Sequence, residues 1–236
     1  MLKQRGFSLT ELMIGSTVGL LVIAGALQLY VLNLRATNDN LRLSRLNQEL
    51  RATLDLLRND LRRAGHWRLE PGTDAPTDNP FQAGDNDIRL GRATGEAPRS
   101  CILYSYDLNG DRQVGVGPSG LAGPTTSTDN LERFGMRLRA GQVQMRNGGA
   151  AFNCTSGSWQ AVTDPDTDIT LLRFESIETC HNLSDRAHDC VAGDAALLRR
   201  QIRIALHARS RSDPNIVQEL TSTVAIANDK LFSAYP

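Results

Sequence analysis

The sequence has no excess of basic residues, because its 26 lysines and arginines are balanced by 26 aspartates and glutamates. Aromatic residues are also few, at 5% of the chain, and they form no patch interleaved with basic residues. Proteins that bind nucleic acids usually carry a basic patch or stripe. We therefore expect no nucleic-acid partner for this chain.

The short motifs that identify many enzymes are missing as well. The four histidines are scattered, and no nucleophile–base motif is apparent. Residues 66–100 and 115–130 are rich in Pro, Gly, Asp and Asn, and contain neither repeats nor a phosphate-cradling pattern. We expect long irregular surface loops there, no enzyme activity and no cofactor.

One long stretch, from Leu12 to Leu34, lacks charged residues altogether. At a rise of ~1.5 Å per residue, a helix of this length crosses a ~30 Å hydrocarbon core. A basic head with Lys3 and Arg5 precedes it, and Glu11 stands at its margin. A carboxylate at the edge of a membrane span is energetically expensive, so Glu11 is a candidate functional residue.

The order of these features argues against a secretory signal peptide, whose small-residue cleavage site follows the apolar core. Here the small residue, Gly6, comes before the apolar run. Cleavage after Gly6 would remove the basic head and keep the apolar helix. The alternative is an ordinary signal anchor with a chance glutamate.

The layout Arg5-Gly6-Phe7-Ser8-x-x-Glu11, followed by Leu, Ile, Val, Ala and Gly, resembles the N-terminus of type IV prepilins and type II secretion pseudopilins. The resemblance implies that residues 1–6 are a leader, which a prepilin peptidase removes between Gly6 and Phe7 before methylating the Phe7 amine. It also implies that Glu11 pairs with the N-terminal amine of a neighbouring subunit, because a buried carboxylate needs a partner charge.

The charges around the span indicate its direction. Because Lys3 and Arg5 precede it, the positive-inside tendency places the N-terminus in the cytoplasm and the later domain in the periplasm. Basic residues after the span, among them Arg35 and Arg42, weaken this inference. We expect a single-pass inner-membrane protein, with residues 7–34 as the transmembrane and assembly half of a long helix.

The helix is expected to continue as an amphipathic half over residues 35–64. Spacings of three and four residues place leucines on one stripe that docks on the protein's own domain. Gly65 is a stop signal. The stripe contains Leu43, Leu46, Leu50, Leu54, Leu57 and Leu61, and the opposite, solvated face contains Arg51, Arg58, Asp60 and Arg62.

Residues 65–236 form the globular domain, in which alternating polar and apolar residues predict strands. Ala140-Gly141 predicts a hairpin turn. A helix followed by antiparallel strands gives an α+β, type IV pilin-like fold with the helix on one face of a sheet. The expected strands are 101–106, 134–138, 142–146, 169–177, 201–208 and 217–227.

Three segments of this domain, 101–111, 132–139 and 169–174, resemble minor pilins of the W type and the related J-type pseudopilins. The resemblance implies a minor pilin that joins other minor pilins, primes assembly of the major pilin, and lies at the pilus tip, often beneath an adhesin. It thereby implies a role in adhesion and twitching motility. The alternatives are a J-type pseudopilin of type II secretion and a membrane-anchored periplasmic binding or sensor domain.

The four cysteines suggest two disulfides, because their count is even and the domain is expected outside the cytoplasm. Of the three pairings, we favour Cys180–Cys190, which closes a polar loop, together with Cys101–Cys154. The alternative is a zinc site, whose spacing fits no familiar finger. Its ligands would be Cys180, His181, His188 and Cys190.

Asp107, Asn109 and Asp111 place oxygen side chains at alternate positions, as at the start of a calcium loop. The resemblance to an EF-hand loop ends there, since Arg112 stands where glycine is needed and Pro118 where glutamate is needed. Asn-Gly also favours a plain turn. A turn and a weak calcium site are therefore both open at this position.

Overall fold

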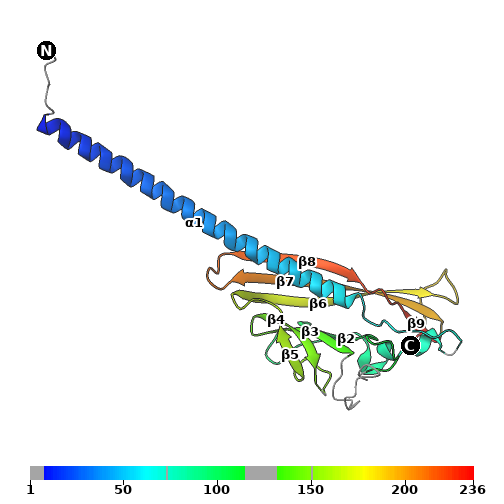
Figure 1. The fold of residues 1–236 in the computed structure, drawn as a ribbon. Helices are drawn as coiled ribbons and strands as arrows, with labels where there is room; N and C mark the ends of the chain where they lie inside the picture. The colour runs from blue at the N-terminus through cyan, green and yellow to red at the C-terminus, as the bar shows by residue number, and fades with distance from the viewer. Residues whose placement is uncertain (1–7, 73, 115–131, 150) are drawn as a thin grey trace. The chain divides into compact units, whose positions relative to one another are not determined.

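The computed structural model describes residues 8–72, 74–114, 132–149 and 151–236. The chain divides into two compact units, Met1–Arg45 and Leu46–Pro236. A single helix, α1 (Leu9–Leu61), runs from the first unit into the second (Figure 1). The expected leader junction, Gly6 and Phe7, and the expected loop over residues 115–130 lie outside the described residues.

In the second unit, α1 buries one face of its last four turns. Five leucines of the expected stripe are between 0% and 8% exposed, whereas Leu43, one turn earlier in the first unit, is 40% exposed. Asp60, expected on the solvated face, is instead 8% exposed and accepts hydrogen bonds from two tyrosines. That expectation was wrong because buried hydroxyl groups satisfy the carboxylate.

The strands form two antiparallel sheets rather than the single sheet expected. The first sheet has the order β1-β2-β3-β4-β5, and the second has β6-β7-β8 with β9 also paired to β7. The first contains β1 (Arg89–Gly91), β2 (Cys101–Ser105), β3 (Arg133–Arg139), β4 (Gln142–Gly148) and β5 (Ser158–Ala161). The second contains β6 (Thr167–Asn182), β7 (Ala196–Ser210), β8 (Val217–Ala225) and β9 (Lys230–Phe232).

One core joins both sheets to the helix, which confirms the α+β, pilin-like class. Alternate residues of β7, such as Ile202, Ile204 and Leu206, are fully buried and pack in the same cluster as Tyr104 of β2 and Leu50 of α1. The expected Ala140-Gly141 turn joins β3 to β4, with φ of 52° and 74° at its two residues. Two consecutive positive φ values are the requirement of a type I′ hairpin turn.

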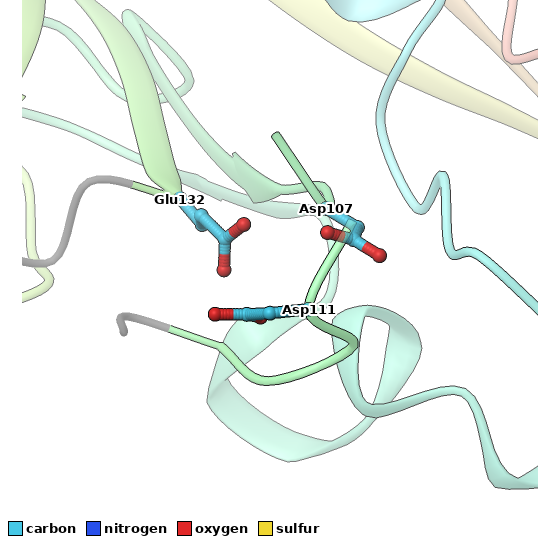
Figure 2. A group of neighbouring side chains, drawn as sticks. All are labelled: Asp107, Asp111 and Glu132. Carbon is cyan, nitrogen blue, oxygen red and sulfur yellow. The ribbon is translucent and has the colours of Figure 1, made fainter. Parts of the chain in front are cut away.

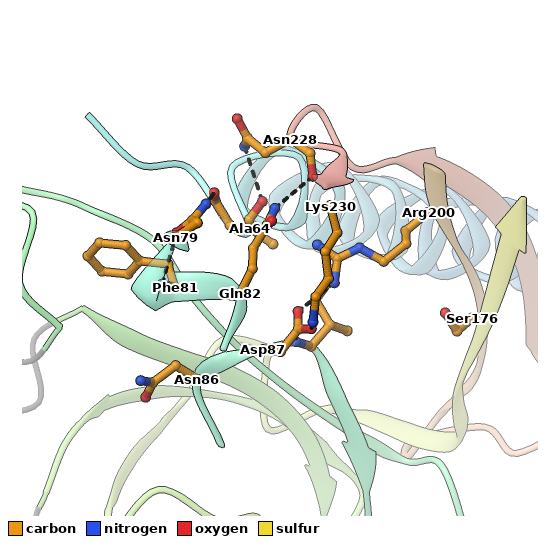
Figure 3. Close-up of polar contacts among 12 residues, drawn as sticks. Ala64, Asn79, Phe81, Gln82, Asn86, Asp87, Ser176, Arg200, Asn228 and Lys230 are labelled. Atoms are coloured by element: carbon orange, nitrogen blue, oxygen red, sulfur yellow. Dashed lines mark hydrogen bonds and ion pairs between the residues drawn. The ribbon is translucent and has the colours of Figure 1, made fainter. Parts of the chain in front are cut away.

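Residues 66–100 are mostly irregular, as expected, and contain three short 3₁₀ turns: η1 (Pro76–Asp78), η2 (Pro80–Gln82) and η3 (Gly84–Asn86). Side chains of this segment and of the chain's last residues close the end of α1 (Figure 3). The Asn228 amide donates to the Ala64 carbonyl at 3.1 Å, and the Asn79 amide donates to the Gly65 carbonyl at 2.9 Å. Gly65 has φ of 72°, the left-handed conformation expected of a helix stop.

The cysteines pair as Cys101–Cys154 and Cys180–Cys190, the connectivity that the sequence analysis favours. The first bridge links β2 to the segment before β5, with Cys101 fully buried. The second bridge links Cys180, near the end of β6, to Cys190 in the loop that connects β6 to β7. Because Cys180 and Cys190 are bonded to each other, neither sulfur is a thiolate that could bind the zinc considered above.

The two bridges are expected to differ in their contribution to stability. In the chain-entropy relation, the Cys101–Cys154 bridge, with a separation of 53 residues, stabilises the fold by about 4 kcal/mol. The Cys180–Cys190 bridge, with a separation of 10 residues, stabilises it by about 3 kcal/mol. Changing Cys101 and Cys154 to Ala also opens space in the core. Urea unfolding of the full chain in detergent should therefore show a larger loss for this pair than for Cys180→Ala with Cys190→Ala. Equal losses would contradict this ordering.

Candidate functional site

The N-terminal motif meets the described structure at the start of α1. Ser8 precedes the first helical residue, and the Oε2 atom of Glu11 accepts a hydrogen bond from the Ser8 N–H at 3.0 Å. The Ser8 carbonyl accepts the first helical bond, from the Leu12 N–H at 3.1 Å. Ser-x-x-Glu is the spacing of a capping box, in which the glutamate reaches back to the residue that precedes the helix.

Glu11 thus caps its own helix, a role that the sequence analysis missed although the Ser-x-x-Glu spacing was visible. Its carboxylate also lies at the positive end of the helix dipole, which favours an anion there. No other acidic residue occurs before Asp39. Glu11 is therefore the only acidic hydrogen-bond acceptor in the first seven turns of α1.

The rest of this part of α1 exposes its apolar side chains, including Leu12, Leu21 and Tyr30 at 67%, 73% and 61%. By length and composition, α1 can cross a membrane, and none of its most apolar window is buried inside the protein. Only lipid or other apolar helices can cover such a surface all round. The helix therefore fits the membrane anchor typical of pilins.

A second polar site lies in the first sheet's loops, where Asp107, Asp111 and Glu132 converge (Figure 2). One oxygen from each carboxylate lies within 4.8 Å of the others. Glu132, which immediately precedes β3, comes 21 positions after Asp111, and no local spacing connects it to the Asp-x-Asn-x-Asp pattern. Only the pairing of β2 with β3 brings it there.

Hydrogen bonds within the loop support the turn anticipated at Asn-Gly. Asp107 accepts from the Gly110 N–H at 2.6 Å, and Asn109 accepts from the Asp111 N–H at 2.8 Å. The Asn109 amide also donates to Asp111 at 2.7 Å. Asn109 therefore stabilises the turn, while Asp107 and Asp111 face Glu132.

Burial raises the pKa of Glu132 to about 7, since its side chain is 1% exposed. Hydrogen bonds from the N–H groups of Leu108 and Asn109 oppose this shift, and the charges of Asp111 and Asp107 add to it. Three carboxylates this close favour binding of one positive charge, either a proton or a hard cation. The oxygen donors fit calcium in kind.

The raised pKa predicts that this site loses stability as the pH rises. Between pH 4.5 and about 7, folded Glu132 keeps a proton that the unfolded chain releases, so its contribution is complete below pH 4.5 and lost above 7. A pKa shift from 4.5 to about 7 corresponds to about 3 kcal/mol in the free energy of unfolding. Glu132→Gln, which keeps an acceptor for Leu108, should remove that part of the pH dependence in urea unfolding with a chelator.

The matched control is Glu178→Gln, at an exposed carboxylate that accepts a hydrogen bond from the Ser176 hydroxyl. It should leave the slope of unfolding free energy against pH nearly unchanged. Parallel curves for the wild type and Glu132→Gln would contradict the pKa assignment.

Taken with the exposed apolar start of α1, the helix-on-sheet domain defines a type IV pilin-like protein. Comparison with protein families agrees, since residues 1–27 match the prokaryotic N-terminal methylation motif. Residues 39–226, most of the chain, match the family described as prepilin peptidase-dependent protein B, and the chain belongs to that family. No curated protein and no solved structure gives a match.

Proposed function

We propose that this protein is a minor pilin of the W type, which joins other minor pilins to prime type IV pilus assembly and lies at the pilus tip. The observation that carries the proposal is the methylation motif at the start of a helix whose apolar side chains are exposed. A family dependent on prepilin peptidase supports it. In this role the protein would support adhesion and twitching motility without being an enzyme.

The proposal assigns a task to each part of the chain. Residues 1–6 are the leader, residues 7–34 insert in the inner membrane and later in the fibre, and residues 35–64 carry the helix into the domain. Residues 65–236 are the periplasmic, later extracellular, domain. The leucines buried on α1 support this division, because they begin at Leu46.

Processing gives the first test. The mature protein should begin at Phe7 with a methylated amine, and the leader should persist in cells that lack the peptidase. Gly6→Ala should strongly reduce cleavage, because a tight peptidase site that accepts glycine has no room for a Cβ atom. Intact-mass measurement of the purified protein reports both changes.

Ser16→Ala, inside the span, is the control and should be cleaved normally. A chain that still begins at Met1 in peptidase-competent cells would refute the pilin assignment and favour a membrane-anchored binding or sensor domain. Recovery of the mature protein with secretion pseudopilins, and not with pili, would instead identify a J-type subunit.

A further inference from the structure

The strand β8 lies at an edge of the second sheet (Figure 1). It pairs with β7 over nine residues, from Arg209↔Val217 to Gln201↔Ala225, with no register shift. Its other side has no strand partner among the described residues. It is therefore a regular strand with one open side.

The direction of its backbone groups follows from two hydrogen bonds at its ends. The Ser210 N–H donates to the Ile216 carbonyl, and the Ile226 N–H donates to the Arg200 carbonyl, both at 3.0 Å. Bonded pairs alternate along an antiparallel ladder. The N–H and C=O groups of the even-numbered residues of β8 therefore point toward β7, and those of the odd-numbered residues point away from β7, toward the open side. Those residues, Val217, Glu219, Thr221, Thr223 and Ala225, are all exposed.

Natural sheets usually protect such an edge with lysine, proline, a bulge or a short strand. The sequence of β8, VQELTSTVA, contains none of these protections and is rich in β-branched residues. The other edges differ. β1 and β5 have three and four residues, and the far side of β6 donates to loops through the Ile169 and Phe174 N–H groups.

We propose that β8 accepts an extended segment of a different protein as an additional antiparallel strand of the second sheet. Main-chain bonds to the outward groups would supply affinity, and alternate side chains would supply specificity. The inference goes beyond the proposed function, which does not itself require a partner strand at β8.

A second copy of this chain is a poorer complement to the open edge. Two β8 strands that pair with each other bring no cationic residue opposite Glu219, because β8 contains no lysine, arginine or histidine. Among the described residues, the other edges that a second copy offers are β1, β5 and β9, which are three or four residues long, and β6, whose far side already donates to loops.

The neighbours of β8 indicate the chemistry of the partner strand. On the core side, Leu220 and Val224 pair with Leu206 and Ile202, so apolar residues suit the positions opposite them. Glu219, on the outer face, is the only charged residue of β8. Its Oε1 atom lies 3.5 Å from the Nδ1 atom of His207 on the neighbouring strand β7. A cationic residue is the complement on the open side.

The β7 segment itself has this pattern, so its peptide, QIRIALHAR (residues 201–209), is a defined probe. We expect the labelled peptide to bind the full chain in detergent, measured by fluorescence anisotropy. Thr221→Pro should weaken binding about tenfold or more, because it removes an outward N–H without breaking the ladder to β7. Thr221→Val keeps that N–H and should bind as the wild type does. A peptide N-methylated at alternate residues should not bind.

Circular dichroism checks that Thr221→Pro is folded, and Thr223→Lys, which adds an edge lysine, is the second variant that should weaken binding. The proposal would be overturned if both edge variants bound the peptide as tightly as the wild type does, or if the wild type did not bind it. Self-association that Thr221→Pro abolishes would also overturn it, because the occupant would then be a second copy. Leader cleavage, scored by mass on the same preparations, tests the proposed function separately.

Discussion

Replacing Glu11 with alanine is expected to leave membrane insertion and leader cleavage largely intact, and to lower sharply the amount of this protein in sheared fibres. Removal of the leader creates a positive amine at Phe7, next to a helix start that favours an anion. Packed helices in a fibre exclude water, so each charge then needs a counter-charge. Removing one partner of a buried pair costs about 3–5 kcal/mol.

A second substitution separates the charge from the cap. Glu11→Gln keeps an oxygen that can accept from the Ser8 N–H but removes the negative charge. If charge pairing drives incorporation, the amount of either variant in the fibre fraction should be about a tenth of the wild-type amount or less, at equal membrane levels. On the proposed priming role, piliation and twitching should fall with them, since a priming subunit acts before the major pilin polymerises. Wild-type incorporation of Glu11→Gln would show that the carboxylate acts only as a helix cap.

Loss of the contact at Asp60 is expected to destabilise the second unit strongly. Asp60 accepts from the hydroxyl groups of Tyr104 and Tyr106, and the second bond measures 2.8 Å. Burial, and then the Asp60 charge, raise the pKa of both tyrosines, so both remain donors at ordinary pH. The Arg63 guanidinium carbon lies 4.2 Å from the centre of the Tyr106 ring and adds a nearby positive charge.

Tyr104→Phe should cost about 1.5–3 kcal/mol in the free energy of unfolding, because it removes a buried hydrogen bond to a charged group. In an Asp60→Asn background the same change should cost clearly less, and the difference measures the coupling. Tyr30→Phe, at an exposed hydroxyl on α1, is the control. Equal costs in the two backgrounds would contradict a charge-assisted bond.

Local patterns were enough to predict the helix and the six principal strands. Leucine spacing located the buried face of α1 because a helix repeats every 3.6 residues, and alternation located β7 because strands repeat every two. The extensions of β6 and β7 to Asn182 and Ala196 escaped prediction. The β6 extension, residues 178–182, is mostly polar and exposed, and pairing with β7 keeps it extended. The β7 extension, residues 196–200, buries Ala196 and Leu198, but it is too short to show a clear alternation in the sequence.

The errors share a physical origin, which is contact between residues distant in sequence. The sequence pattern places Asp60 on a solvated face, whereas Tyr104 of β2 and Tyr106 just after it donate to its carboxylate in the structure. Glu132 joins the acidic cluster through the pairing of β2 with β3. The division into two sheets likewise depends on long-range packing of β2 and β6 in one core. By contrast, the match to the N-terminal methylation motif depends on short-range order along the chain, and the roles of Gly6, Phe7 and Glu11 within it stay predictions.

The closure of α1 by the end of the chain determines how the protein would carry tension. A pull on the helix from its N-terminal side reaches the second unit through the packed leucines, the tyrosine bonds to Asp60 and the bonds at its final turn. There the Ala227 N–H and the Asn228 amide hold the carbonyls of Arg62 and Ala64. These contacts act in parallel, so they share the load instead of breaking one after another.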